Sequence, residues 1–361
     1  MFSIKLFILS LLSLSTPQMS TLLEAYKDDP VQLHHLIPLD FPSLRAVPES
    51  HVWPESYNFR VSPSDENLSI PIVDLKDPNI ADNIGRACQT WGIFQVTNHG
   101  LPSGLLEDVE YEARRLFSLP VEQKRKVLRS PCGATGYGCA RITPFFPKLM
   151  WHEGFTVMGS SVDHARVLWP HGYKRFCDAM DNYQKHMKTL AHNLFLTILS
   201  SLDLSEPEKN WAAAVYDSES NALQLNSYPA CPDPTRTIGL APHTDSLLLT
   251  ILHHCETNGL QTFRDGFGWV PVHQVSGALT VNVGDLLHIL SNGKFPTVCH
   301  RAVVNRTRHR ISVAYFYGPR ADSVFGPFSR LGFPRYRTLT LKEYIGIKAK
   351  HLDKALSLIT N

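Results

Sequence analysis

Residues 238–252 read IGLAPHTDSLLLTIL, an apolar and partly β-branched stretch that is typical of strand structure in a buried sheet. Side chains two positions apart on a strand point to the same face. His243 and Asp245 are therefore expected to project together, while Thr244 faces the other way. An imidazole and a carboxylate on one face of a buried strand are two of the ligands that a metal site needs.

A third candidate ligand, His300, lies in a second apolar stretch. Four polar residues, 305–308, separate this stretch from the strand-like residues 311–317, which is the pattern of a β-hairpin. With this turn His300 would lie opposite Arg310 or within a residue of it, and facing residues of an antiparallel pair share one face. Arg310 and Ser312 are again two positions apart, so we expect both side chains to point toward the same space.

These residue types fit an iron site with an anion site beside it. Two neutral imidazoles and one carboxylate on one face of an octahedral Fe(II) leave three positions open for an oxidant and a chelating acid. An arginine offers a planar fork of donors to a second carboxylate, and a serine hydroxyl adds another donor. The sequence thus predicts a metal site of His243, Asp245 and His300. It also predicts a carboxylate site of Arg310 and Ser312.

A purely structural role is the alternative for His243 and Asp245. The chain contains 17 histidines, and a buried histidine is often satisfied by a backbone carbonyl, so the His-x-Asp spacing is a weak motif by itself. The matching spacing of His300 and of the pair Arg310-x-Ser312 favours the metal site.

Other histidines and arginines near these motifs lack a comparable spacing. No role is assigned to His253, His254, His288 and His309. The arginines that flank the expected hairpin are interpreted as solvated charges: Arg301, Arg306 and Arg308.

Four more motifs resemble those of the plant 2-oxoglutarate- and iron-dependent dioxygenases: PIVDL (71–75), WGIFQVTNHG (91–100), NSYPACP (226–232) and GDLLHILSNG (284–293). The resemblance runs from about Pro71 to the C-terminus. It implies that the two histidines and the aspartate bind Fe(II). It also implies that Arg310 and Ser312 hold the distal carboxylate of 2-oxoglutarate, and that Tyr228 donates a further hydrogen bond to it. From its place before a proline alone, Tyr228 would be an ordinary turn aromatic. O2 as co-substrate, and ascorbate to keep the iron reduced, are further implications.

A narrower resemblance, to the gibberellin 3-beta-dioxygenases, is carried by residues 136–156, GYGCARITPFFPKLMWHEGFT, and by segments 19–53 and 341–356. It implies the 3-beta-hydroxylation of gibberellin precursors to bioactive gibberellins, with succinate and CO2 as co-products and a diterpenoid acid as substrate. Another plant dioxygenase, acting on a different gibberellin carbon or on a flavonoid, would share the iron and co-substrate motifs. A non-catalytic small-molecule binder on the same fold is a second alternative.

The segment 136–156 also contains residues that could contact the substrate. Four large apolar side chains suit a rigid apolar ligand or, equally well, the packing of a core: Phe145, Phe146, Met150 and Trp151. Lys148 and Arg141 are the candidates for binding the carboxylate of a diterpenoid acid.

The 361 residues with 43% hydrophobic content can build one large core. We expect a mainly β protein with flanking helices, and the family resemblance implies a double-stranded β-helix, or jelly roll, as its core. Residues 1–18 are a candidate leader or gene-model extension, and residues 19–69 are expected to form a loosely ordered N-terminal arm with one helix at Leu22–Lys27. A helix-rich region is expected at 70–210. The jelly-roll core is expected at 211–330, with a C-terminal helix within 331–361.

Several elements are expected from hydrophobic periodicity. Strands are predicted at 70–75, 92–97 and through much of 223–316. Helices are predicted at 80–90 and 103–118, at 341–359, and in a long amphipathic stretch from Phe176 to Ile198.

Composition excludes some classes of function. The net charge of +2, with interspersed signs, gives no basic stripe for nucleic acid. Seven cysteines without a paired spacing indicate reduced thiols and a cytoplasmic location. Met1–Thr16 has the charge and apolar length of a secretory signal, which keeps a secreted protein as an alternative, and it is too short to span a membrane. No membrane partner is predicted, and the sequence specifies no oligomeric state.

Overall fold

The computed structural model describes residues 26–27, 29–57, 68–215, 221–255 and 257–361. An eight-stranded sheet has the strand order β1-β2-β10-β7-β12-β5-β4-β3, and a four-stranded sheet has the order β6-β11-β8-β9. The pair β1 and β2 is parallel, and the other strand pairs of the two sheets are antiparallel. This architecture confirms the prediction of a mainly β protein with flanking helices around a double-stranded β-helix.

The strands have the following bounds. The large sheet contains β1 (Ile72–Asp74), β2 (Ile93–Thr97), β3 (Gly136–Gly138), β4 (Glu153–Val157), β5 (Ala222–Tyr228), β7 (Leu249–His254), β10 (Leu279–Val283) and β12 (Arg310–Tyr317). The small sheet contains β6 (Leu240–His243), β8 (Leu260–Arg264), β9 (Gly268–Pro271) and β11 (His300–Ala302). A separate pair is formed by β13 (Val324–Phe325) and β14 (Leu339–Thr340).

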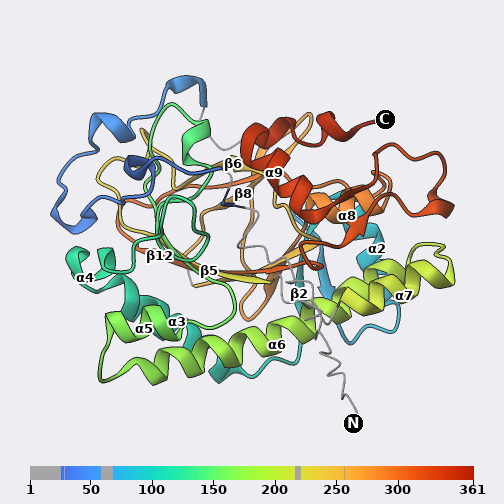
Figure 1. Ribbon diagram of the computed structural model, residues 1–361, viewed down its shortest axis with the longest axis horizontal. Helices are drawn as coiled ribbons and strands as arrows, with labels where there is room; N and C mark the ends of the chain where they lie inside the picture. Colours follow the sequence, from blue (N-terminus) through green and yellow to red (C-terminus); the bar gives the residue numbers. More distant parts are fainter. Residues whose placement is uncertain (1–25, 28, 58–67, 216–220, 256) are drawn as a thin grey trace, which may run out of the picture.

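Helices flank the sheets. They are α2 (Ile80–Thr90), α3 (Ser103–Phe117), α4 (Val121–Arg125), α5 (Val162–Leu168), α6 (Tyr173–Ser200), α7 (Glu206–Ala214), α8 (Asp285–Leu290) and α9 (Leu341–His351). Of these, α2, α3 and α6 contact strands of the large sheet. Helix α6 packs against α2, α3 and α5 and against strands β7 and β12, and Figure 1 shows it running along one side of the molecule. Its apolar stripe from Phe176 to Ile198 is buried, as the periodicity predicts.

The elements predicted in the first part of the chain are confirmed, but the C-terminal helix is shorter than expected. Helices α2 and α3 and strands β1 and β2 lie within a few residues of their predicted bounds. Helix α9 ends at His351 because Leu352 adopts φ +41°, a left-handed conformation that stops an α-helix. Two short 3-10 turns, Leu352–Lys354 and Ser357–Ile359, follow it.

The N-terminal arm is packed where it is described. Its 29–57 segment lies on the barrel in short 3-10 turns, with Trp53 4% exposed. The backbone N–H of Trp53 donates to Arg236 O (2.9 Å), and its indole N–H donates to Leu149 O (2.8 Å). The expectation of a loosely ordered arm is therefore wrong for these residues. The segment is mostly polar, but a few apolar side chains such as Trp53 are buried and fix it to the rest of the protein.

Two predictions fall largely on residues that the structure does not describe. The candidate leader at 1–18 lies outside the described residues. Of the predicted helix Leu22–Lys27, only Tyr26 and Lys27 are described, and they form a turn. In the described part of the chain, none of the helices combines the length and the apolar composition that a membrane crossing needs.

A buried ion pair joins helix α4 to strand β4. Lys124 Nζ lies 2.6 Å from a carboxylate oxygen of Glu153 and also donates to Phe117 O (3.1 Å). The hydroxyls of Tyr137 and Ser227 donate to the same carboxylate, at 2.5 and 3.1 Å. Lys124 and Glu153 are 5% and 3% exposed. The Glu153 carboxylate thus links one helix to three strands of the large sheet.

We predict that Lys124→Met lowers the free energy of unfolding by about 3–5 kcal/mol, because it leaves the Glu153 carboxylate buried without its cation. Urea unfolding followed by circular dichroism measures the change. Lys174→Met, on the exposed face of α6, is the matched control and should change stability by less than about 0.5 kcal/mol. A loss below about 1 kcal/mol for Lys124→Met would show that the pair does not stabilise the fold.

Candidate functional site

Two histidines and one aspartate meet where the small sheet opens into the interior. His243, the last residue of β6, pairs directly with His300, the first residue of β11, and their ring centroids are 4.3 Å apart. The Nε2 atoms of His243 and His300 each lie 3.8 Å from an oxygen of Asp245. One ligand atom from each of the three residues lies within 4.8 Å of the others.

Hydrogen bonds orient both imidazole rings. Nδ1 of His243 lies 2.8 Å from Ala241 O, and Nδ1 of His300 lies 3.1 Å from Val298 O. A carbonyl can only accept, so each Nδ1 carries the proton and each Nε2 of a neutral ring presents its lone pair to the shared space. This is the tautomer that a metal ion requires.

The protonation states also suit a metal. Burial and the neighbouring His300 lower the pKa of His243 to about 4, so that ring is neutral at physiological pH. Burial raises the pKa of the Asp245 carboxyl, but His300, His243 and the Thr250 hydroxyl outweigh it and the pKa is lowered overall. Neutral imidazoles and an ionised carboxylate bind a divalent cation without first losing protons. The three residues therefore fit a ferrous ion.

A buried arginine lies in the same cavity. Arg310, the first residue of β12, pairs with Tyr228 of β5 and is 2% exposed. Its Nη1 donates to Ser312 Oγ at 3.5 Å, its Nη2 donates to Nδ1 of His254 at 3.0 Å, and its Nε has no partner among the described residues. Its guanidinium carbon stands 5.0 Å from the centre of the Tyr228 ring. All these contacts are to neutral groups, so the guanidinium is available to a carboxylate ligand.

The predicted hairpin is wrong. Strand β11 belongs to the small sheet and β12 to the large one, so His300 pairs with His243 and not with Arg310. The turn itself exists, because the Asn305 side chain accepts hydrogen bonds from the backbone N–H groups of Thr307 and Arg308. The turn carries the chain from the small sheet to the large one. His300 and Arg310 therefore line the same cavity from different sheets.

The prediction for residues 243–245 is also wrong in part. Strand β6 ends at His243, so Asp245 reaches the site from a loop. Thr244 does not simply face away: its backbone oxygen and its hydroxyl accept from Lys348 Nζ of α9, at 2.8 and 2.7 Å. Lys348 is also in close contact with the Asp285 carboxylate.

Asp285 completes this network behind the metal-ligand candidates. Its backbone N–H donates to Asp245 O (2.8 Å), and its carboxylate accepts from the Tyr344 hydroxyl (2.6 Å). Lys348 and Asp285 are 7% and 1% exposed. Sequence reasoning missed both residues. The only signal was the position of Asp285 in the GDLLHILSNG motif.

Two further assignments need correction. Arg301 is 1% exposed, stacks 4.1 Å from the Trp269 ring centre and donates to Gln261 Oε1 (2.7 Å), so it is not a solvated charge. His254, to which no role was assigned, holds Arg310 as described above. Arg306 and Arg308 are exposed as predicted.

The candidate substrate residues separate into two groups. Phe145 and Arg141 line the cavity, whereas Met150 and Trp151 are buried in hydrophobic clusters, as the core-packing alternative predicted. Phe146 packs 5.6 Å from the Trp53 ring. The remaining candidate, Lys148, does not line the cavity. Its Nζ binds the backbone oxygen and the carboxylate of Glu49 at 2.8 and 3.0 Å.

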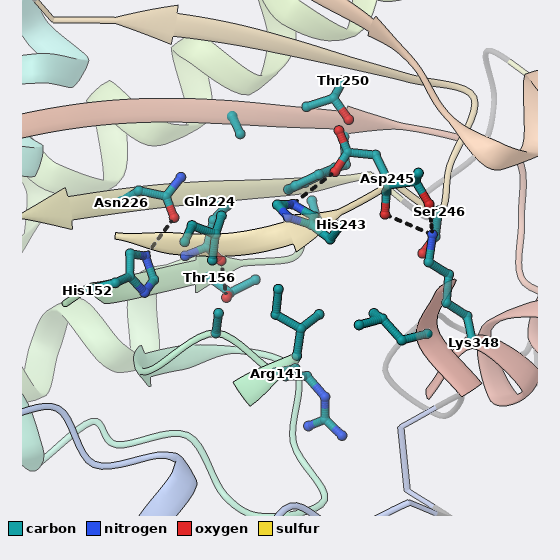
Figure 2. A pocket seen from close by; sticks show the side chains of 18 of the residues that line it. Arg141, His152, Thr156, Gln224, Asn226, His243, Asp245, Ser246, Thr250 and Lys348 are labelled. Carbon is teal, nitrogen blue, oxygen red and sulfur yellow. Dashed lines mark hydrogen bonds and ion pairs between the residues drawn. The ribbon is translucent and has the colours of Figure 1, made fainter. Parts of the chain in front are cut away.

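One cavity of about 690 Å³ contains all six predicted site residues: Tyr228, His243, Asp245, His300, Arg310 and Ser312. Figure 2 shows part of this cavity, with His243 close to Asp245 and the end of the Lys348 side chain close to Ser246. Apolar side chains cover other parts of its wall: Phe145, Met158, Leu240, Leu247, Phe316 and Ile345. This volume is in the range that accommodates a small-molecule ligand. The cavity thus combines a metal-binding group, a buried cation and apolar space, while the roles of the six residues remain predictions.

Two family models match the chain. Residues 219–319 match the 2OG-Fe(II) oxygenase superfamily. Residues 70–174 match the N-terminal region described as "non-haem dioxygenase in morphine synthesis N-terminal".

Similar proteins and structures agree with these matches. The chain is 50% identical to gibberellin 3-beta-dioxygenase 1 of Pisum sativum over 94% of both chains. It is 47% identical to gibberellin 3-beta-dioxygenase 1 of Arabidopsis thaliana over 94% of this chain and 98% of that protein. The crystal structure of JOX2 in complex with 2OG, Fe and JA is similar with a TM-score of 0.76, at 28% identity over 88% of this chain and 95% of that one. A rice dioxygenase for auxin oxidation has a TM-score of 0.67 at 24% identity over 81% of this chain and 100% of that one, which supports the fold.

We predict that Lys348→Met weakens Fe(II) binding about 10-fold or more, because groups that orient metal ligands contribute effects of this size. Anaerobic titration calorimetry measures the dissociation constant, with circular dichroism to verify folding. Lys350→Met removes a 58% exposed lysine of the same helix and should leave the constant unchanged. Equal Fe(II) affinity of the Lys348→Met variant and the unaltered protein would contradict a positioning role for Lys348.

Proposed function

The chain belongs to the gibberellin 3-beta-dioxygenases, within the 2-oxoglutarate- and Fe(II)-dependent oxygenase superfamily, and from this premise we propose that it hydroxylates gibberellin precursors at the 3-beta position. It is a dioxygenase that uses Fe(II) and 2-oxoglutarate, with O2 as second co-substrate and succinate and CO2 as co-products. The observation that carries the proposal is the single cavity in which a candidate ferrous site and a buried arginine adjoin apolar space.

In this proposal His243, Asp245 and His300 hold the Fe(II). The bound iron supplies the oxidising chemistry, in which 2-oxoglutarate and O2 are consumed. Three protein ligands leave room for the chelating co-substrate and the oxidant. The hydrogen bonds from Nδ1 to backbone carbonyls keep both imidazoles in the ligating tautomer.

Arg310, Ser312 and Tyr228 bind the distal carboxylate of 2-oxoglutarate. The guanidinium offers two parallel N–H donors, and the two hydroxyls add one donor each. Nδ1 of His254 accepts a hydrogen bond from Nη2 of Arg310 and so fixes the orientation of the guanidinium group. Because Arg310 and Ser312 are 2% and 1% exposed, little water competes for these donors.

The substrate in this proposal is a diterpenoid acid that lies against the apolar wall. We assign the catalytic core to residues 211–330, supported by the helix-rich region 70–210, while the arm at 19–69 and the C-terminal 331–361 contribute further parts of the wall through Val31 and Leu352. The seven cysteines are free, which supports a cytoplasmic location. Ascorbate would keep the iron reduced between turnovers.

The test is product analysis. Purified protein is incubated with Fe(II), 2-oxoglutarate, ascorbate and a panel of gibberellin precursors, with flavonoids as competing candidates, and the products are identified by mass spectrometry. We expect a 3-beta-hydroxylated gibberellin and an equal amount of succinate. Hydroxylation at another gibberellin carbon, or of a flavonoid instead, would replace this function with the corresponding oxidase.

Asp245→Ala should abolish the consumption of 2-oxoglutarate, because it removes the one anionic ligand of the candidate iron site. Succinate release and Fe(II) affinity are the measurements. Asp322→Ala, at an exposed carboxylate that pairs with Arg320, serves as control and should retain full activity. An active Asp245→Ala enzyme would contradict the iron site.

Arg310→Lys should raise the KM for 2-oxoglutarate about 10- to 100-fold, because an ammonium group keeps the charge but loses the bidentate hydrogen bonds. Steady-state kinetics at varied 2-oxoglutarate measures this change, with Arg308→Lys at the surface as the matched control. If the KM stays at its original value, the carboxylate is bound elsewhere.

A further inference from the structure

A second buried arginine lines the same cavity and has no role in the proposal above. Arg129 follows helix α4, and its backbone N–H donates to Tyr137 O of strand β3 at 2.8 Å. The residue is 4% exposed. It lines the cavity together with the candidate iron ligands.

The guanidinium of Arg129 contacts neutral groups among the described residues. Nη2 donates to Thr156 Oγ1 at 2.8 Å, Nη1 makes a long contact of 3.4 Å with Cys139 O, and Nε has no partner. Burial lowers the pKa of Arg129 to about 10, so the group still carries its charge at neutral pH. A buried guanidinium with spare N–H donors is costly unless an anion binds it.

Two acidic groups in this part of the molecule are engaged elsewhere. The carboxylate of Asp29, which also lines the cavity, lies 3.6 Å from Lys350 of α9. The Glu153 carboxylate is held by Lys124 and by two hydroxyls, as described for the fold. The described part of the chain therefore provides no counter-ion for Arg129.

Arg141 adds positive charge nearby but has its donors occupied. Its Nη1 and Nη2 donate to the backbone oxygens of Gly133 (2.6 Å) and Asp29 (3.0 Å), and its guanidinium carbon lies 4.5 Å from the centre of the Tyr26 ring. Figure 2 shows its guanidinium turned away from the other labelled side chains. Arg141 thus holds the arm in place, and of these two arginines Arg129 is the one with an unpartnered N–H group.

Strand register separates Arg129 from the predicted 2-oxoglutarate clamp. The hydroxyl of Thr156, which accepts from Arg129, donates to Gln224 Oε1 across the β4–β5 pair (Figure 2). Gln224 is four residues along β5 from Tyr228, the partner of Arg310, which is about 13 Å at strand rise. The two arginines are therefore linked to different positions along β5.

We propose that Arg129 binds the carboxylate of the substrate, with Thr156 and Gln224 holding its guanidinium in place. This inference rests on the proposed function, because a gibberellin precursor is a rigid apolar acid. With the carboxylate held at Arg129 and the ring system against the apolar wall, one fixed part of the ring faces the iron site. Arg129 is accordingly a residue that determines both affinity for acids and the position of attack.

The first experiment compares a gibberellin precursor as free acid and as methyl ester with the full-length protein. Dissociation constants are measured anaerobically in the presence of Fe(II) and 2-oxoglutarate, and kcat/KM in air. The ester loses the negative charge but keeps the ring, so we expect it to bind about 10- to 100-fold more weakly than the acid. Equal affinity for acid and ester in the unaltered protein would overturn the proposal without any substitution being needed.

The second experiment uses Arg129→Gln and, as a matched control from the same cavity wall, Arg141→Gln. Arg129→Gln should weaken binding of the acid about 10- to 100-fold and abolish the preference for acid over ester, with the KM for 2-oxoglutarate unchanged. Arg141→Gln should keep that preference. If Arg129→Gln retains the preference, or if only Arg141→Gln loses it, the carboxylate is bound at another residue.

The two proposals fail in different ways. Hydroxylation of the precursor at a carbon other than C3 would refute the proposed function and leave the acid-to-ester ratio as a test of Arg129. A 3-beta-hydroxylated product with no preference for the acid would refute the role of Arg129 alone.

Discussion

The burial of guanidinium groups without a described acidic partner is the constraint on which the cavity depends. Arg310 is held by a serine and a histidine, and Arg129 by a threonine and a distant carbonyl. These acceptors fix the side chains without cancelling their charge, so each guanidinium keeps its positive charge inside the protein. Buried positive charges favour anionic ligands, and they suit the proposed reaction, in which co-substrate and substrate are both carboxylic acids.

The arrangement of the two sheets sets the distance between the candidate iron site and the proposed co-substrate site. The small sheet positions the histidines through the direct pairing of His243 with His300, and the large sheet positions Arg310 through its pairing with Tyr228. The separation of the sites is therefore fixed by how the sheets face one another, and sequence spacing has little influence on it. Lys348 adds a third support, because it binds the backbone between two of the metal-ligand candidates from a helix near the C-terminus.

Local patterns predicted those parts of the molecule that local forces determine. Periodicity and motifs predicted helices α2, α3 and α6 and the candidate site residues. Both signals depend on the types and the spacing of residues that are close in the sequence. The change of sheet between β11 and β12 could not be predicted, since an asparagine turn at residue 305 is equally compatible with a hairpin. Arg129, Arg301 and Lys348 also escaped prediction. A basic residue in an unremarkable stretch gives no sign that distant segments will bury it.

The docking of the N-terminal arm has a consequence for how the chain folds during synthesis. The family model of the N-terminal region begins at residue 70, yet Trp53 is anchored to Leu149 and Arg236. The segment around Trp53 is made before both partners, so it cannot complete its packing until Arg236, 183 residues further along the chain, has been made. Contacts of such sequence separation form slowly because a long loop must close first. The arm that contributes to the wall of the cavity is thus made before the residues on which it packs.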